Sequence, residues 1–404
     1  MASKDSRSPF TPGVPVPVEY FHGRKAEIER LRRALRQCAG GRNANVFITG
    51  ERGIGKSSLA AYARALAERE YSFVGAHCYL GAEQTLEGAC AHIFERILEE
   101  LPERSLFEKV REVFRQYIRS VDLLGLNVEF TRERDDLKGL PREFLPKLRT
   151  VLKELQPSKK GLVLILDDLN GVSRVPEFSR FIKSFVDEMA TSRRGSLPLL
   201  LLLVGVQERM DDLALTQPSV RRIFDVAELG PLSGDEARAF FARAFASVGC
   251  AVEPDAMGLA VHYSGGFPML MHEIGDSIFW CDRDGRIDAE DASNGILWAA
   301  DTVGRKYLEP EVYRAIRSKS YLSILRQIGK MPLSVVIQRS ELKRMLPETE
   351  RAKLDNFLKK MRKIGVLVPG DERGEYRFSN WLHRLYVSLE AGRAQGARTG
   401  HERT

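Results

Sequence analysis

A run of glycines followed by a lysine and a serine carries the clearest chemistry in the sequence. Residues 50–57 read Gly-Glu-Arg-Gly-Ile-Gly-Lys-Ser and match G-x-x-x-x-G-K-[ST] at every fixed position. Such glycines let the backbone wrap a phosphate chain, with N–H groups pointing inward at a helix N-terminus. Lys56 would neutralise the β- and γ-phosphates, and the Ser57 hydroxyl would bind Mg²⁺. The residues expected to line this nucleotide site are Gly50, Gly53, Ile54, Gly55, Lys56, Ser57 and Ser58.

Two carboxylates that end an apolar run form the second chemical feature. Residues 162–168 read Leu-Val-Leu-Ile-Leu-Asp-Asp. In a buried strand, this end of the run lies at the edge where open α/β sheets bind ligands. Asp167 suits Mg²⁺ binding, and Asp168 stands where a general base would orient the attacking water. With Lys56, Asp168 is therefore expected to be catalytic in hydrolysis of the bound triphosphate.

The elements that must position these groups can be read from the apolar pattern. A short apolar run at residues 45–49 precedes the glycine-rich loop, and a helical pattern at residues 58–66 follows it. Further apolar runs occur at residues 72–78, 162–166, 199–204 and 225–229. Because these runs lack strict alternation and are joined by helical patterns, they predict a buried parallel sheet. A mostly helical insertion precedes residue 162, with a short strand expected at residues 126–130.

The pattern changes in the last part of the chain. Strand patterns stop at Pro231, and Ser233 with Glu236 forms a capping-box pattern that opens a helical region. From about residue 320, short helices are followed by a longer one, and then by two short strands at residues 366–368 and 375–378. Helices followed by a hairpin in about 80 residues are typical of a winged helix.

Composition excludes several classes of protein. The 404 residues are 43% hydrophobic and 29% charged, which is ordinary for a folded globular chain and not for a disordered or fibrous one. The longest apolar run is far short of the roughly 20 residues of a membrane span, and the N-terminus lacks an apolar leader. Five scattered cysteines with no C-x-x-C pair argue against a disulfide scaffold or a zinc site. We therefore expect a cytoplasmic protein without a membrane contact.

Positive charge is concentrated at the C-terminal end. From residue 317 onward the chain has 19 Lys and Arg against nine Asp and Glu, whereas the whole chain carries a net charge of +7. The expected helix over residues 350–364 and the hairpin after it would present basic groups to nucleic-acid phosphates. These are Lys353, Lys359, Lys360, Arg362, Lys363, Arg373 and Arg377. One alternative is that the charge excess is only a solvated basic face. Another is that the winged helix is used for protein contact or autoinhibition.

Further segments give the chain a resemblance to the AAA+ ATPases, and among them to the origin-recognition initiators and the STAND ATPases. They are Phe21-His22-Gly23-Arg24, and residues 198–206, 218–224 and 228–233. Residues 264–268, Ser-Gly-Gly-Phe-Pro, are similar to the G-x-P motif of STAND lids. The resemblance implies an α/β P-loop NTPase fold, with an AAA+-like parallel sheet core, a helical lid and a C-terminal winged-helix domain.

The resemblance also implies domain boundaries. We expect a flexible N-terminal arm over residues 1–20, the AAA+ P-loop ATPase core over 21–231, the helical lid over 232–310, the winged-helix domain over 311–391 and a disordered basic tail over 392–404.

The resemblance assigns roles to single residues. Phe21 and His22, with Gly23, would flank the adenine, and Pro268 would contact the base. Gln207 would lie near the sensor-1 position. Arg222, or its neighbour Arg221, would reach the γ-phosphate of an adjoining subunit.

Two departures from the family pattern suggest a switch with slow turnover. Asp168 stands where many fast hydrolases carry Glu, and the segment 266–271 lacks the sensor-2 arginine of many initiators. We therefore expect an ATP- and Mg²⁺-dependent switch that hydrolyses ATP slowly, self-assembles as a homo-oligomer and engages double-stranded DNA. The alternatives are a STAND signalling or defence ATPase with an autoinhibitory or protein-binding winged helix, and a transposition or replication accessory ATPase that loads an unknown protein partner.

Overall fold

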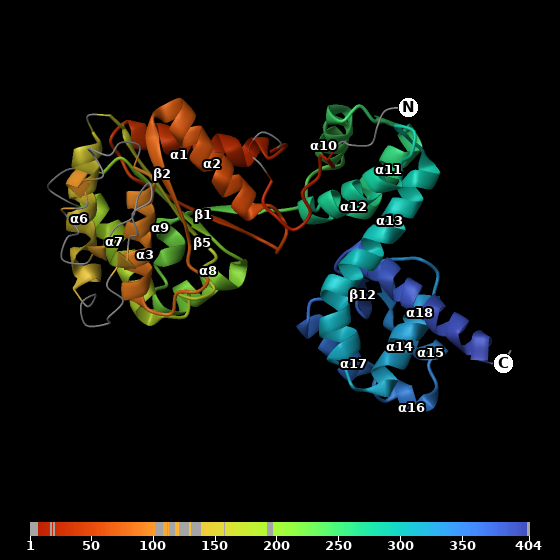
Figure 1. Ribbon diagram of the computed structural model, residues 1–404. Coiled ribbons are helices and arrows are strands. Elements are labelled where there is room, and N and C mark those ends of the chain that lie inside the picture. The colour runs from red at the N-terminus through yellow and green to blue at the C-terminus, as the bar shows by residue number, and fades with distance from the viewer. Residues whose placement is uncertain are drawn as a thin grey trace. The chain divides into compact units, whose positions relative to one another are not determined.

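The computed structural model describes residues 7–16, 18, 21–101, 108–110, 112, 118–120, 129–130, 139–156, 158–191 and 197–401. The chain forms two compact units, one of Pro15–Gly230 and one of Met1–Val14 together with Pro231–Thr404. Their helices and strands are labelled in Figure 1. The chain therefore passes from one unit to the other twice, after Val14 and after Gly230.

A five-stranded parallel sheet is the centre of the unit Pro15–Gly230. Its strand order is β2-β5-β6-β1-β7, and all neighbours are parallel. The strands are β1 (Ala44–Gly50), β2 (Phe73–Tyr79), β5 (Gly161–Asp167), β6 (Leu199–Val204) and β7 (Asp225–Leu229). Every residue of β5 and β6 is buried, so both faces of these central strands are covered. The predicted buried parallel sheet is confirmed.

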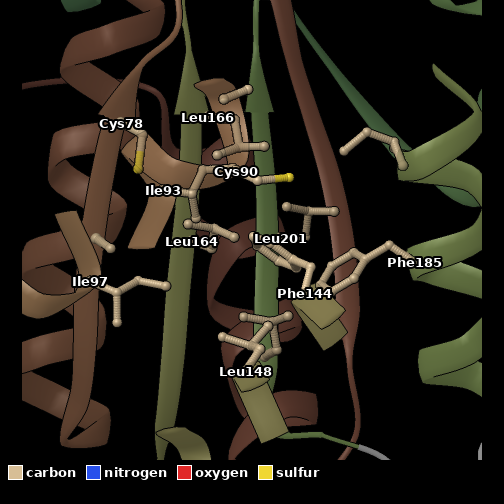
Figure 2. Packing of buried hydrophobic residues seen from close by; sticks show 14 of the residues in the cluster. Cys78, Cys90, Ile93, Ile97, Phe144, Leu148, Leu164, Leu166, Phe185 and Leu201 are labelled. Carbon is tan, nitrogen blue, oxygen red and sulfur yellow. The ribbon is translucent and has the colours of Figure 1, made fainter. Parts of the chain in front are cut away.

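Helices cover both faces of this sheet. They are α1 (Lys25–Ala39), α2 (Lys56–Tyr71), α3 (Leu86–Glu99), α6 (Leu140–Leu155), α7 (Pro176–Thr191), α8 (Gln207–Thr216) and α9 (Val220–Ile223). Figure 2 shows one core, where α3, α6 and α7 pack against alternate side chains of the central strands. In β5 these are Leu162, Leu164 and Leu166, since successive strand residues point to opposite faces.

The insertion before β5 contains a small antiparallel hairpin. It pairs β3 (Ile118–Ser120) with β4 (Glu129–Phe130). The strand expected at residues 126–130 corresponds to β4 in its last two residues, and residues 126–128 lie outside the described residues.

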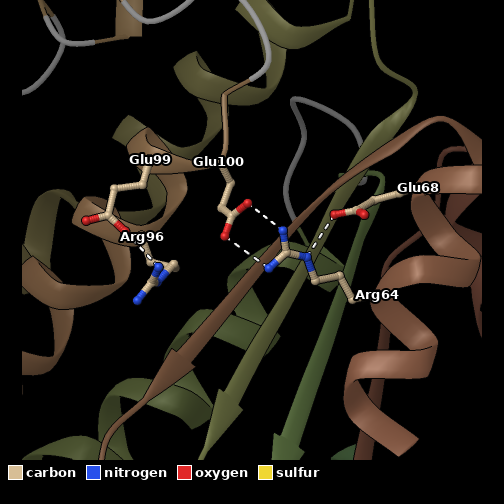
Figure 3. Close-up of polar contacts among 5 residues, drawn as sticks. All are labelled: Arg64, Glu68, Arg96, Glu99 and Glu100. Atoms are coloured by element: carbon tan, nitrogen blue, oxygen red, sulfur yellow. Dashed lines mark hydrogen bonds and ion pairs between the residues drawn. The ribbon is translucent and has the colours of Figure 1, made fainter. Parts of the chain in front are cut away.

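An arginine joins the helix after the glycine-rich loop to the end of the next helix. Figure 3 shows Arg64 of α2 with its guanidinium between Glu68 and Glu100. Its Nη1 donates to Glu100 Oε1 at 3.0 Å, and its Nε donates to Glu68 Oε1 at 2.8 Å. This fork-like contact fixes α2 against the C-terminal end of α3.

The second unit begins with a helical region. It contains α10 (Gly234–Ser247), α11 (Pro254–Ser264), α12 (Pro268–Cys281) and α13 (Ala289–Val303), followed by a π-helix, η2 (Gly304–Arg314). Strands β8 (Ala251–Val252) and β9 (Arg286–Ile287) pair in parallel. The predicted capping box is confirmed, because Ser233 Oγ accepts from the Glu236 N–H and the Glu236 carboxylate accepts from the Ser233 N–H.

The N-terminal segment packs into this helical region. Phe10 is 4% exposed, and its ring lies 5.0 Å from that of Phe245. The Pro- and Ser-rich composition of residues 1–20 predicts a flexible arm. Around residue 10 the structure differs from this prediction, because the Phe10 side chain is buried in the hydrophobic core of the helical region.

The rest of this unit has helices and a three-stranded sheet. The helices are α14 (Lys319–Lys330), α15 (Arg339–Met345), α16 (Glu348–Arg351), α17 (Leu354–Lys363) and α18 (Trp381–His401). Strands β10 (Val336–Gln338), β11 (Leu367–Pro369) and β12 (Glu375–Phe378) form an antiparallel sheet in the order β10-β12-β11. This region is consistent with the predicted winged-helix domain.

The C-terminal helix runs further than the sequence analysis expected. Helix α18 continues to His401, across most of the stretch assigned to a disordered tail. Alanine and arginine in this stretch are good helix formers, so propensity extends the helix. Among the residues that the structure describes, no helix has the length and apolar character needed to cross a membrane.

Candidate nucleotide-binding site

The glycine-rich loop lies between β1 and α2, as the sequence predicted. Gly50 has φ +146°, and a Cβ there would lie 2.6 Å from the Leu229 carbonyl oxygen, so a side chain does not fit. Gly55 is the N-cap of α2 with φ +94° and supplies no side-chain cap to the first turn. The N–H groups of that turn are therefore available to an anion, at the end where the helix dipole favours negative charge.

Lys56 is the first residue of α2 and folds back over the loop. Its Nζ donates to the carbonyl oxygens of Gly50 at 3.0 Å and Glu51 at 2.7 Å. Burial lowers the pKa of Lys56, and the nearby charge of Asp167 partly offsets this. Within the described residues, the Lys56 ammonium has hydrogen bonds to neutral carbonyls only. A phosphate oxygen, which brings a full negative charge, would stabilise this partly desolvated ammonium.

Asp167 lies at the C-terminal end of β5 and is held at both carboxylate oxygens. Its Oδ1 accepts the backbone N–H of Asp168 at 2.8 Å, and its Oδ2 lies 3.0 Å from Nε2 of His77 on β2. Asp167 is only 4% exposed. Its negative charge raises the pKa of Lys56 against the larger effect of burial. The structure thus brings the predicted lysine and the predicted metal-binding acid together.

Asp168 is placed differently from what a general base requires. It is exposed, has φ +51°, and its carboxylate accepts a hydrogen bond from the Asn170 amide. A Cβ on Gly81 would lie 2.1 Å from Asp168 Oδ2, so the carboxylate rests on the loop after β2. In the sheet order, β2 and β1 lie on opposite sides of β5. The Asp168 carboxylate is therefore turned away from the strand that carries the glycine-rich loop.

The donor set fits Mg²⁺. Ser57 offers a hydroxyl from the first turn of α2, and Asp167 offers a nearly buried carboxylate beside Lys56. Magnesium prefers oxygen ligands and is often held by one or two protein groups together with substrate phosphates.

The segment before α1 contacts the nucleotide-site elements. Phe21 stacks on Tyr62 of α2, with ring centroids 4.8 Å apart. Arg24, which is 7% exposed, donates from Nη2 to the Ile54 carbonyl at 3.0 Å and so holds the glycine-rich loop. The Ser58 hydroxyl accepts the N–H of Val16 at 3.2 Å. The role of Arg24 was not predicted from the sequence, because its partner, the Ile54 carbonyl, is 30 positions away.

Gln207 and Arg221 are brought together by an acid that the sequence analysis did not select. Gln207 begins α8 directly after β6, and its Nε2 donates to Asp211 Oδ1 at 3.2 Å. Arg221 Nη2 donates to the same oxygen at 2.6 Å. The Arg222 side chain is exposed and makes no hydrogen bond or ion pair with any described part of the chain, whereas its backbone N–H donates to the Ser219 carbonyl. The two candidate arginines therefore differ: one is engaged within the subunit, and the other is free.

Other predicted site residues lie in the second unit. Pro268 is the first residue of α12, after the two glycines Gly265 and Gly266. The apolar face of α17 is buried, as predicted. The predicted basic residues are all exposed, on or next to α17 and on the β11–β12 hairpin: Lys353, Lys359, Lys360, Arg362, Lys363, Arg373 and Arg377. Of these, Lys353 donates to Ser320 Oγ at 2.9 Å.

Comparisons with known proteins agree with this geometry. Residues 20–216 match the sequence model of the AAA ATPase domain. The whole chain is similar in structure to a Walker-type ATPase of Pyrococcus abyssi, with a TM-score of 0.56, 21% identity, and 91% of this chain and 96% of that chain covered. It is also similar to the ORC2 protein of Aeropyrum pernix in its ADPNP–ADP complexes, with a TM-score of 0.60, 16% identity, and 97% and 99% covered. A sequence comparison with curated proteins finds no match.

At these identities the structural likeness establishes the fold. The chain has the P-loop AAA+ fold, with a five-stranded parallel sheet covered by helices.

Proposed function

We propose that this AAA ATPase domain serves an ATP-binding switch that hydrolyses ATP slowly and self-assembles. The observation that carries the proposal is the glycine-rich loop at the N-terminus of α2, with Lys56 inside it and Asp167 beside it. In the proposed complex the phosphates lie against the N–H groups of the loop. The Lys56 ammonium exchanges the Gly50 and Glu51 carbonyls for phosphate oxygens.

Ser57 and Asp167 hold Mg²⁺ in the proposed site. When bound there, Mg²⁺ would supply positive charge that offsets the negative charge of the phosphate oxygens. The task of Asp167 is to present its carboxylate in a fixed orientation, and its two hydrogen bonds with protein groups support that role.

Slow hydrolysis follows from the position of Asp168. To accept a proton from the attacking water, its carboxylate must leave Asn170 and the surface of Gly81. This rearrangement is needed in addition to the chemical step, and the short Asp side chain has little reach. We therefore propose Asp168 as a general base that acts only after such a change.

Self-assembly would complete the site through Arg222. Arg221 is paired with Asp211 within its own subunit, so Arg222 is the candidate that can reach a neighbour. Phe21 and His22 are proposed to flank the adenine, which is supported by the stacking of Phe21 on the helix that follows the loop. Contact of Pro268 with the base stays a prediction from the family resemblance.

A second activity, binding of double-stranded DNA, is favoured by one observation. Helix α17 buries its apolar face and leaves four basic side chains exposed in its last five residues. Winged-helix geometry would present such a helix and hairpin to phosphates. The competing proposals are a protein-binding or autoinhibitory winged helix and an accessory ATPase that loads a protein partner.

The nucleotide proposal is tested with Lys56→Ala. We expect the affinity for a fluorescent ATP analogue to fall about 10- to 100-fold, because a charge-assisted hydrogen bond contributes about 1.5–3 kcal/mol. Lys25→Ala is the matched control, since Lys25 is an exposed lysine that also begins a helix, α1. Parent-like affinity in a folded Lys56→Ala protein would contradict the site. Asp167→Ala should in addition remove Mg²⁺-dependent hydrolysis.

A further inference from the structure

A histidine on the neighbouring strand touches the candidate magnesium ligand. His77 lies on β2, which pairs in parallel with β5, and its Nε2 is 3.0 Å from Asp167 Oδ2. The exposed fractions of the two side chains are 8% and 5%. A hydrogen bond in such a dry environment is stronger than one at the surface.

The direction of this hydrogen bond follows from the proposed role of the carboxylate. Asp167 Oδ1 accepts the Asp168 N–H at 2.8 Å. A carboxylate that binds Mg²⁺ is ionised and only accepts hydrogen bonds, so in the proposed site His77 donates through Nε2–H. The imidazole is fixed in turn by stacking on Tyr79, with ring centroids 4.6 Å apart and planes 19° apart. The carboxylate is therefore held by one backbone donor and one side-chain donor of fixed orientation.

Packing alone does not account for this histidine. The flanking buried positions of β2 hold Ala76 and Cys78, and an apolar residue at position 77 would fill the space without a buried polar ring. A buried imidazole is tolerated when it is hydrogen-bonded, and here its partner is the carboxylate that ends β5.

We propose that His77 is a positioning residue that holds the Asp167 carboxylate in the orientation that binds Mg²⁺. This inference rests on the nucleotide site proposed above. Groups that hydrogen-bond a metal-binding carboxylate commonly change metal affinity about 10- to 100-fold when they are removed. The neutral imidazole suffices, because only its Nε2–H is used.

The test measures metal binding directly. Mn²⁺ replaces Mg²⁺ as an EPR-visible probe, and its affinity for the ADP-bound full chain is compared among variants. His77→Leu removes the donor and should weaken Mn²⁺ binding about 10- to 100-fold. His77→Gln keeps an N–H donor and should restore most of this affinity. ADP affinity in EDTA should be the same in all three proteins, because the phosphate cradle itself is unchanged.

His92→Leu is the matched control. His92 Nδ1 lies 3.3 Å from Glu83 Oε1, so this variant removes another histidine–carboxylate contact from the same unit. It should bind Mn²⁺ as the parent does. Parent-like Mn²⁺ affinity in His77→Leu, or an equal loss in His77→Gln and His77→Leu, overturns the proposed role.

Two further comparisons cover the cases in which His77→Leu does not fold or the nucleotide site itself is wrong. If His77→Leu does not fold, His77→Gln is compared with His77→Asn, whose amide is one methylene shorter. Weaker Mn²⁺ binding by His77→Asn supports positioning, and equal affinities overturn it. Lys56→Ala separates the two proposals. If Lys56→Ala loses ADP binding while His77→Leu binds Mn²⁺ as the parent does, the nucleotide site stands and only the role of His77 is contradicted.

Discussion

His272 of α12 is a buried histidine whose environment sets its protonation. Its Nδ1 accepts the backbone N–H of Thr11 at 3.0 Å, so this nitrogen carries no proton. The rings of Phe10 and Phe240 lie against it, with centroids 6.1 and 5.0 Å away. Desolvation in this apolar site lowers the pKa of His272 to about 4. The native protein therefore holds this ring neutral at pH values where an exposed histidine becomes charged.

A loss of stability in mild acid follows from this pKa. Between pH 6.5 and about 4 the unfolded chain binds a proton at His272 that the folded chain does not. The free energy of unfolding should therefore decrease as the pH falls, by up to about 1.4 kcal/mol per pH unit from this group. Urea unfolding of the parent between pH 7 and 5 measures the slope.

His272→Gln isolates the contribution of this histidine. Glutamine keeps an acceptor for the Thr11 N–H and has no titratable group. The free energy of unfolding should change less with pH in this variant, and the difference in slope from the parent is the contribution of His272. Identical slopes in the two proteins would show that the ring is not kept neutral by the fold.

Single residues differ in how far their roles could be predicted from sequence. Roles for Lys56 and Asp167 could be proposed from sequence because each lies in a local pattern, a glycine-rich loop and an apolar run ending in acids. His77 was not found, because its partner is 90 positions away and only strand pairing brings them together. The orientation of Asp168 was also beyond prediction, since it depends on its contact with Gly81.

At the scale of elements, the N-terminal segment and α12 fit each other closely. A Cβ at Gly275 would lie 2.3 Å from Phe10 Cε1. Gly275→Ala should therefore destabilise the protein by about 1–3 kcal/mol through overpacking. In a Phe10→Ala background the same change should be neutral, or stabilising by up to about 1 kcal/mol, because alanine favours helix more than glycine does. Denaturant unfolding of the four proteins measures this coupling.

Gly258 supplies the control for this cycle. It lies within α11, and a Cβ there would meet no atom within 4 Å. Gly258→Ala should be neutral or stabilising in both backgrounds. An equal penalty for Gly275→Ala with and without the Phe10 ring would mean that the segment does not occupy this site in solution.

Strands could be predicted from the sequence where their burial determines the pattern of apolar residues. Strands of a parallel sheet are covered on both faces, so β5 and β6 appear in the sequence as unbroken apolar runs. The docking of residue 10 was not predictable, because one phenylalanine among Pro and Ser produces no periodicity. The length of α18 was underestimated, since glycines near the end of the chain were read as disorder.

At the scale of the whole molecule, substitutions of Arg221 and Arg222 should have different effects on ATP hydrolysis by the assembled protein. Arg222→Ala should leave ATP affinity unchanged and reduce turnover of the assembled protein, since arginines supplied in trans contribute about 10³- to 10⁵-fold in other phosphoryl-transfer enzymes. Any effect of Arg221→Ala on the ATPase rate should arise within the subunit that carries it, because Arg221 and Gln207 both donate hydrogen bonds to Asp211. ATPase rate is measured as a function of protein concentration.

Mixed assemblies decide whether the site is shared. A subunit with Arg222→Ala keeps Asp168, and a subunit with Asp168→Asn keeps Arg222. Mixing the two inactive proteins should recover activity at interfaces where one supplies the acid and the other the arginine. No recovery, together with a parent rate that is independent of concentration, contradicts a site shared between subunits.

At the scale of the whole molecule, the proposed DNA binding by the exposed basic side chains of α17 can be tested through its dependence on salt. Each phosphate contact releases counterions, so the logarithm of affinity should fall with the logarithm of salt, by a slope of about 0.9 per contact. Replacing Lys359, Lys360 and Lys363 by Ala should weaken binding similarly for all DNA sequences, and should flatten the slope by about two to three units.

The control for this experiment removes the same number of positive charges from a different part of the chain. Alanine at Lys25, Lys153 and Lys160, three exposed lysines of the α/β unit, lowers the net charge equally. If α17 is the contact, only its own triple variant changes the slope, because counterion release depends on groups that meet phosphates and not on total charge. Equal effects of the two variants would indicate general attraction. Parent-like binding by the α17 variant at every salt concentration would favour a protein-binding or autoinhibitory role for this region.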